Sequence, residues 1–122
     1  MAGARFEDLT VWQRMLDLNL GVWKATTRGA AHRDCRFANQ IRGAADSAER
    51  NVAEGFGRFN PDECAQFLGM SRASTLETQT LLKKGLTVGY WSQEEFDRLD
   101  ALAVRGLQAL ATFERYLRPP QE

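Results

Sequence analysis

One histidine and two cysteines are the residues of this 122-residue chain that are best suited to catalysis or metal binding. His32 lies in a polar connection beside Arg33 and Asp34, where it could act as a general base. Cys35 and Cys64 have neither a redox spacing nor the spacing of zinc ligands, and the Glu-x-x-His pairs of dimetal bundles do not occur. We therefore expect an exposed loop histidine and free thiols in a reducing cytoplasm, with no catalytic residue, metal or cofactor.

The segment Gly55-Phe56-Gly57-Arg58 has glycines like those of a phosphate-binding loop. Phosphate loops follow a strand and open a helix with a lysine in place, whereas this segment links two helical patterns. We interpret it as a tight turn, with Gly55 and Gly57 ending the preceding helix in the left-handed conformation. Arg58 could still contact an anion, because the free amides at the start of the next helix favour negative charge.

Basic residues gather between residues 24 and 58, although the whole chain has 16 basic and 16 acidic residues. A protein that depends on bulk attraction to nucleic acid usually has a basic excess, and this chain has none overall. Two interpretations stay open: a solvated helix face, which Asp46 and Glu49 favour, and a patch that contacts nucleic acid with avidity from a ring of subunits. The candidate contact residues are Arg28, Arg33, Arg36, Arg50 and Arg58.

Five polar residues on either side of the glycine turn recur at spacings that turn them partly inward. Antiparallel pairing about the turn places Arg42 near Glu77 and Ser47 near Met70. We predict a semi-buried ion pair between Arg42 and Glu77, which would penalise a wrong helix register more than it adds stability. The candidate structural cluster consists of Arg42, Ser47, Asn51, Glu54 and Glu77.

Four segments with apolar residues at helical spacing must position these side chains. Asp8, Asn60 and Ser92 are the expected N-caps of the first, third and fourth helices, because their side chains can accept bonds from free amides. The segment Thr26–Arg33, broken by Gly29, is expected to be a connection. The predicted helices cover about residues 9–27, 34–56, 61–87 and 93–118.

No segment shows a strand or hairpin signal, and the connections between helices are short, which favours antiparallel neighbours. The sequence therefore predicts an all-α fold, an antiparallel up-down four-helix bundle that occupies residues 1–122 as one domain. Inward-facing Ala44, Ala45 and Ala48 allow a close approach of two helices. No apolar run approaches the length of a membrane span, so we expect no membrane contact and a cytoplasmic location.

The first predicted helix carries two adjacent apolar stripes, although one stripe is enough to join a bundle. Trp12 and Trp23 belong to the second stripe. We interpret the surplus as a contact with another subunit; the alternative is that the tryptophans lie half-exposed at the bundle edge.

The chain also contains an ordered series of motifs, which runs from Phe6 to about Leu117 and so covers nearly the whole sequence. Its residues are Phe6–Gln13, Gln40-Ile41-Arg42, Ala45, Ser47, Asn51–Gly55, Gly57-Arg58, Phe67-Leu68, Ala73-Ser74, Glu77 and Leu81. This series resembles the small four-helix-bundle proteins encoded in intervening sequences of bacterial 23S ribosomal RNA genes.

This resemblance implies an antiparallel bundle that assembles into a ring, commonly a pentamer, with no established reaction. The chain is similar also to the accessory protein of diversity-generating retroelements, which shares the fold and works with a reverse transcriptase and RNA. Those accessory proteins are strongly basic, whereas this chain is charge-neutral. We expect a non-enzymatic homo-oligomeric assembly protein; the alternative is a nucleic-acid-binding accessory protein.

Overall fold

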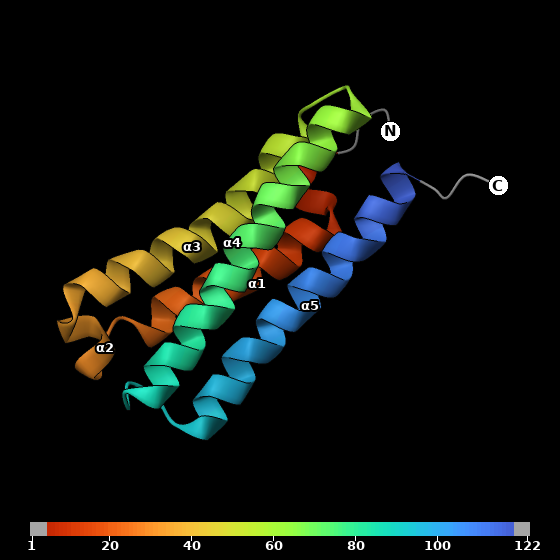
Figure 1. Cartoon of the computed structure of the whole chain (residues 1–122). Helices are drawn as coiled ribbons and strands as arrows, with labels where there is room; N and C mark the ends of the chain where they lie inside the picture. The colour runs from red at the N-terminus through yellow and green to blue at the C-terminus, as the bar shows by residue number, and fades with distance from the viewer. Residues whose placement is uncertain (1–4, 119–122) are drawn as a thin grey trace.

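Four long helices lie side by side in the computed structural model, which describes residues 5–118 (Figure 1). Within these residues the chain forms helices and turns and no strand. The elements in chain order are η1 (Phe6–Asp8), α1 (Thr10–Ala25), α2 (Gly29–Arg33), α3 (Cys35–Phe56), α4 (Pro61–Thr87) and α5 (Gln93–Leu117). No helix of the described part is long and apolar enough to cross a membrane.

Two of the three predicted N-caps of the long helices are confirmed. Asn60 accepts a bond from the Asp62 amide at 2.7 Å, and Ser92 accepts one from the Glu95 amide at 3.1 Å. The predicted cap at Asp8 is wrong: Asp8 lies in η1, and the N-cap of α1 is Leu9, which makes no side-chain cap bond. The turn of η1 displaces the start of α1 by one residue.

Between α1 and α3 the structure has a short helix where the sequence predicted only a connection. This helix, α2, spans Gly29–Arg33, and Gly29 begins it with a φ of 72°. Because such a backbone conformation is strained for residues with a Cβ, the glycine starts the new helix rather than merely breaking the old one. Ala31 anchors α2, since it is buried in the hydrophobic core.

Each long helix packs against two of the others: α1 and α4 each contact both α3 and α5. The inward residues predicted for α3 are buried, and Ala45 and Ala48 are fully inaccessible to solvent. Small side chains on the facing sides of α3 and α4 let these two helices approach closely. The middle of α4 contributes hydroxyl groups instead of apolar atoms: Ser71, Thr75 and Thr78 are all buried.

The register between α3 and α4 differs from the predicted one by about one helical turn. The hydroxyl of Ser47 lies 2.8 Å from that of Ser74, rather than near Met70, and Ser71 donates to the Ala48 carbonyl at 2.6 Å. These bonds give the buried hydroxyl of Ser71 and the half-buried hydroxyls of Ser47 and Ser74 partners on the facing helix. The position of the turn alone does not reveal this requirement.

Gly57 is the C-cap of α3, as predicted, but the left-handed conformation predicted for Gly55 and Gly57 is wrong, because neither residue has a positive φ. Gly57 has a φ of −72°, and Gly55 lies buried within α3. A Cβ on Gly55 would lie 3.1 Å from the Cβ of Phe67 and 3.2 Å from the carbonyl oxygen of Cys64. Small size, not handedness, is therefore what this position requires.

Candidate functional site

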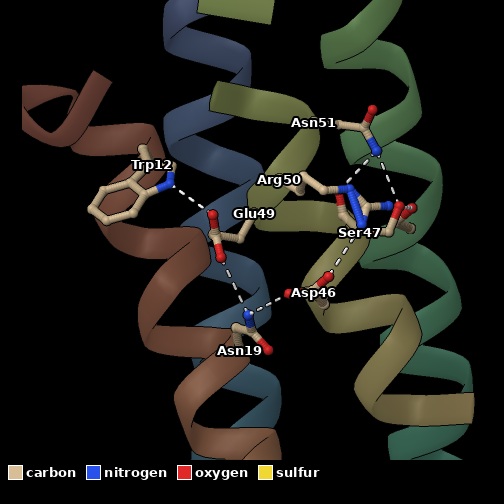
Figure 2. Close-up of polar contacts among 8 residues, drawn as sticks. Trp12, Asn19, Asp46, Ser47, Glu49, Arg50 and Asn51 are labelled. Carbon is tan, nitrogen blue, oxygen red and sulfur yellow. Dashed lines mark hydrogen bonds and ion pairs between the residues drawn. The ribbon is translucent and has the colours of Figure 1, made fainter. Parts of the chain in front are cut away.

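A chain of polar contacts joins α1 to α3 on one face of the bundle, where both helices contribute side chains (Figure 2). The indole Nε1 of Trp12 donates to Glu49 at 2.9 Å, and the amide of Asn19 donates to Glu49 at 3.3 Å and to Asp46 at 3.5 Å. Asp46 also forms an ion pair with Arg50 at 3.1 Å. Two carboxylates of α3 are thus held by hydrogen bonds from α1.

Sequence reasoning did not identify Asn19 and Glu49 as parts of this contact. Asn19 is only 6% exposed, and its side-chain oxygen is buried without a hydrogen-bond partner among residues 5–118. The available signal was spacing, because Trp12 and Asn19 are seven residues apart and therefore share a helix face.

The ion pair predicted between Arg42 and Glu77 is not formed. The guanidinium of Arg42 instead donates to the side-chain oxygen of Thr26 at 2.7 Å and to its carbonyl at 3.0 Å, and it stacks over Trp23 at 4.0 Å. Glu77 is exposed on α4. Arg42 therefore fastens the end of α1 to α3, because that helix end offers a carbonyl without an intrahelical partner.

Of the predicted structural cluster, the structure brings together only Ser47 and Asn51. The Asn51 amide donates to the Ser47 carbonyl at 2.9 Å and lies 3.0 Å from its hydroxyl, within the same helix (Figure 2). Glu54 is exposed and forms an ion pair with Arg58 at 3.9 Å. The five residues consequently occupy separate places rather than one site.

The five candidate nucleic-acid contacts divide into two groups. Arg50 and Arg58 each have a carboxylate partner one helical turn away on α3 or its end. Arg28, Arg33 and Arg36 are exposed at the end of the bundle where α2 lies, and none of them forms an ion pair with another described residue. The available positive charge is therefore concentrated at the α2 end.

A carboxylate and a phenol lie close together at this same end. Asp34 accepts a bond from the Phe37 amide at 3.1 Å and another from the hydroxyl of Tyr90. The Tyr90 bond, then the Phe37 amide and the nearby Lys84 and Arg36 hold the pKa of Asp34 below its ordinary value. The same bond to Asp34 raises the pKa of Tyr90.

The two tryptophans predicted at a subunit contact differ in exposure. Trp12 is half-buried by its contacts with Phe6 and Glu49, whereas Trp23 is 46% exposed. Leu20, which sequence reasoning did not single out, is 57% exposed on the same helix. Leu20, Trp23 and half-buried Leu16 form an apolar stripe on the outside of α1. This stripe is here called the α1 outer stripe (Leu16, Leu20 and Trp23).

The residues considered for catalysis or metal binding do not converge. His32 is exposed, and its Nδ1 lies 3.2 Å from the carbonyl oxygen of Thr26. Cys35 is exposed and Cys64 is buried, both as free thiols, and burial raises the pKa of the Cys64 thiol. Within residues 5–118 no group of three or more His, Cys, Asp or Glu side chains is arranged to hold a metal ion.

One family of known proteins matches this chain. The family model described as 23S rRNA-intervening sequence protein matches residues 7–111, which is most of the chain. This chain belongs to the 23S rRNA-intervening sequence protein family. The resemblance seen in the sequence motifs is thereby confirmed.

A solved structure shows the same fold as this member of the family. It is the crystal structure of a protein with unknown function from the S23 ribosomal protein family of Bacteroides thetaiotaomicron VPI-5482. The two chains are 14% identical, the TM-score is 0.78, and the alignment covers 87% of this chain and 99% of the other. Among curated proteins no match was found.

Proposed function

We propose that this protein is a non-enzymatic assembly module, an up-down antiparallel bundle that forms a homo-oligomeric ring in the cytoplasm. The observation that carries the proposal is the α1 outer stripe, in which Leu20 is 57% and Trp23 is 46% exposed. The opposite face of α1 already fills the core through Met15 and Leu18. An apolar stripe beyond what the core needs is typical of a surface covered by a partner, and self-association covers it without a second protein.

The order of contacts along the helices supports the antiparallel part of this proposal. Between α1 and α3, Trp12 pairs with Glu49 near the start of α1, while Arg42 pairs with Thr26 at its end. Residue numbers thus rise along one helix as they fall along the other. A ring of five subunits is the assembly that the family resemblance implies.

Light scattering coupled to size-exclusion chromatography tests the assembly. We expect a particle of several times the 13.8 kDa chain mass, five times for a pentamer, and a shift towards the monomer in Leu20→Lys, because a lysine in an apolar contact must be desolvated. Val88→Lys is the matched control, since Val88 is 53% exposed but lies beyond the end of α4. A monomeric wild-type protein would refute the assembly.

A second function is favoured by the unpaired arginines at the α2 end, and we propose it as the alternative: an accessory protein that contacts RNA. Arg28, Arg33 and Arg36 present charge that no ion pair within residues 5–118 neutralises. Binding of a fluorescent single-stranded RNA should weaken steeply as salt increases, because each phosphate contact releases a counterion. A flat or absent binding signal at low salt would remove this alternative.

A further inference from the structure

A cavity of about 340 Å³ opens between the start of α3 and the end of α4. This volume is at the lower end of the range for small-molecule sites. Both helices and the loop between α4 and α5 contribute to its walls, so the cavity depends on the packing at this end of the bundle. The lining residues are Asp34, Arg36, Phe37, Gln40, Lys84, Val88 and Tyr90.

The charged groups of this cavity leave an excess of one positive charge. Arg36 and Lys84 are both exposed, and neither lies within 4.0 Å of a carboxylate among the described residues. The single carboxylate, Asp34, is already occupied: one oxygen accepts from the Phe37 amide and the other from the Tyr90 hydroxyl. Two cations therefore face a concave space whose lining residues include one carboxylate, and the remaining positive charge favours an anionic ligand.

The remaining wall of the cavity suits a flat ring that carries polar edges. The ring of Tyr90 is fixed by an edge-to-face contact with Phe37, with centroids 5.0 Å apart, and by its bond to Asp34. Val88 adds exposed apolar surface, and the exposed amide of Gln40 can both donate and accept hydrogen bonds. Aromatic surface beside cationic groups is the combination that recognises a nucleobase together with its phosphate.

We propose that this cavity binds one nucleotide, with Arg36 and Lys84 on the phosphate and Tyr90, Val88 and Gln40 beside the base. The nucleotide is either free or one unit of an RNA strand. The RNA form rests on the alternative function proposed above, whereas the free form does not.

Isothermal titration calorimetry with adenosine monophosphate and with adenosine tests the ligand class. We expect the monophosphate to bind with a dissociation constant of about 1 mM or lower and adenosine at least about tenfold more weakly, because two cations contact only the phosphate. No heat from the monophosphate up to about 10 mM, or equal binding of both ligands, would overturn the proposal.

Three substitutions locate the ligand in this cavity. Lys84→Gln should weaken monophosphate binding about fivefold, because one cation is lost. Asp34→Asn should strengthen it by a similar factor, because asparagine preserves the N-cap while the competing negative charge disappears. Lys83→Gln is the matched control, since Lys83 precedes Lys84 on α4 but lies over the ring of Phe96 at 5.4 Å.

Circular dichroism establishes that each variant keeps the fold. Equal affinities of the Lys84→Gln and Lys83→Gln variants for the monophosphate would place the ligand elsewhere and overturn the proposal. The opposite signs expected for Lys84→Gln and Asp34→Asn cannot arise from a general loss of stability, which would weaken binding in both.

Titration with a single-stranded RNA separates this proposal from the alternative function. RNA binding that Lys84→Gln weakens supports the cavity with RNA as the source of the nucleotide. RNA binding that Lys84→Gln leaves unchanged, with no binding of the monophosphate, overturns the cavity proposal while the alternative function stands. Monophosphate binding with the expected pattern but no RNA binding supports the cavity with a free nucleotide, and the alternative function fails.

Discussion

Among the glycines of residues 5–118, Gly85 has the least room for a side chain. A Cβ built on it would lie 2.2 Å from Cζ2 of Trp91, whose ring is held by a 2.9 Å bond from its Nε1 to the Leu82 carbonyl. Gly43, within α3, has no described atom within 4 Å of such a Cβ apart from its chain neighbours and the nearby backbone of its own helix. The two glycines therefore differ in the space around them: Gly85 has no room for a methyl group, whereas Gly43 has room for one.

Substitution by alanine should reveal this difference in the free energy of unfolding. We expect Gly85→Ala to lower it by about 1–3 kcal/mol, because the ring of Trp91 must move, and Gly43→Ala to raise it by about 0.5–1 kcal/mol through helix propensity. Urea denaturation followed by circular dichroism measures both. Equal effects of the two substitutions would contradict the packing described for Trp91.

The lowered pKa of Asp34 makes the stability of the fold depend on pH. Its pKa is lowered in the folded chain, chiefly by the Tyr90 hydroxyl and then by the Phe37 amide. A carboxyl whose pKa is lower when folded contributes stability above its unfolded value of about 3.9, and this contribution is lost as the pH falls through the folded value. The effect thus appears on acidification below about pH 4.

Tyr90→Phe should reduce the loss of stability on acidification, because it removes the largest cause of the lowered pKa of Asp34. Unfolding midpoints in urea at a series of pH values between about 2 and 6 measure the effect. An unchanged pH dependence in Tyr90→Phe would show that the bond from Tyr90 to Asp34 does not persist in solution.

At the scale of the elements, hydroxyl groups set the register between α3 and α4. Ser47 contacts Ser74 across the two helices, and Ser71 contacts the Ala48 carbonyl. A buried hydroxyl needs a partner, and a slip by one turn would separate Ser71 from the Ala48 carbonyl and Ser47 from Ser74. The ends of α4 could be predicted from Asn60 and Pro61 because capping depends on neighbours in the chain, whereas the facing residue depends on a partner far away in sequence.

A double-mutant cycle tests this register. Ser47→Ala and Ser74→Ala together should show a coupling energy of about 0.5–1.5 kcal/mol, as expected for two groups in direct hydrogen-bonding contact. The cycle of Ser47→Ala with Thr80→Ala should show almost none, because Thr80 bonds the Leu76 carbonyl within its own helix. Equal coupling in both cycles would speak against the register.

For the molecule as a whole, charge balance conceals an uneven distribution. The chain has 16 basic and 16 acidic residues. Within the described part of the chain, the arginines at the α2 end form no ion pair, whereas Arg50 and Arg58 do. The net charge therefore says little about the local surface. Ion pairs between exposed groups are weak, but the negative charge of the carboxylate reduces the attraction of each paired arginine for an approaching anion.

Two sets of substitutions should show which part of the molecule contacts RNA. Replacing Arg28, Arg33 and Arg36 by Gln should reduce the slope of log affinity against log salt by about two, whereas replacing Arg50 and Arg58 should change it by less than about one. Fluorescence anisotropy at several salt concentrations measures both slopes. A larger change from the second set would place the contact away from the α2 end.

The sequence by itself determined the helical class, the long segments that form α1, α3, α4 and α5, and the family. These depend on periodicity, caps and ordered motifs, which act between residues close together in the chain. Tertiary structure alone decided that Arg42 bonds Thr26 rather than Glu77, and that Arg36 and Lys84 share a cavity. Such contacts join residues far apart in sequence, and each is chosen by the packing of a whole helix rather than by local preference.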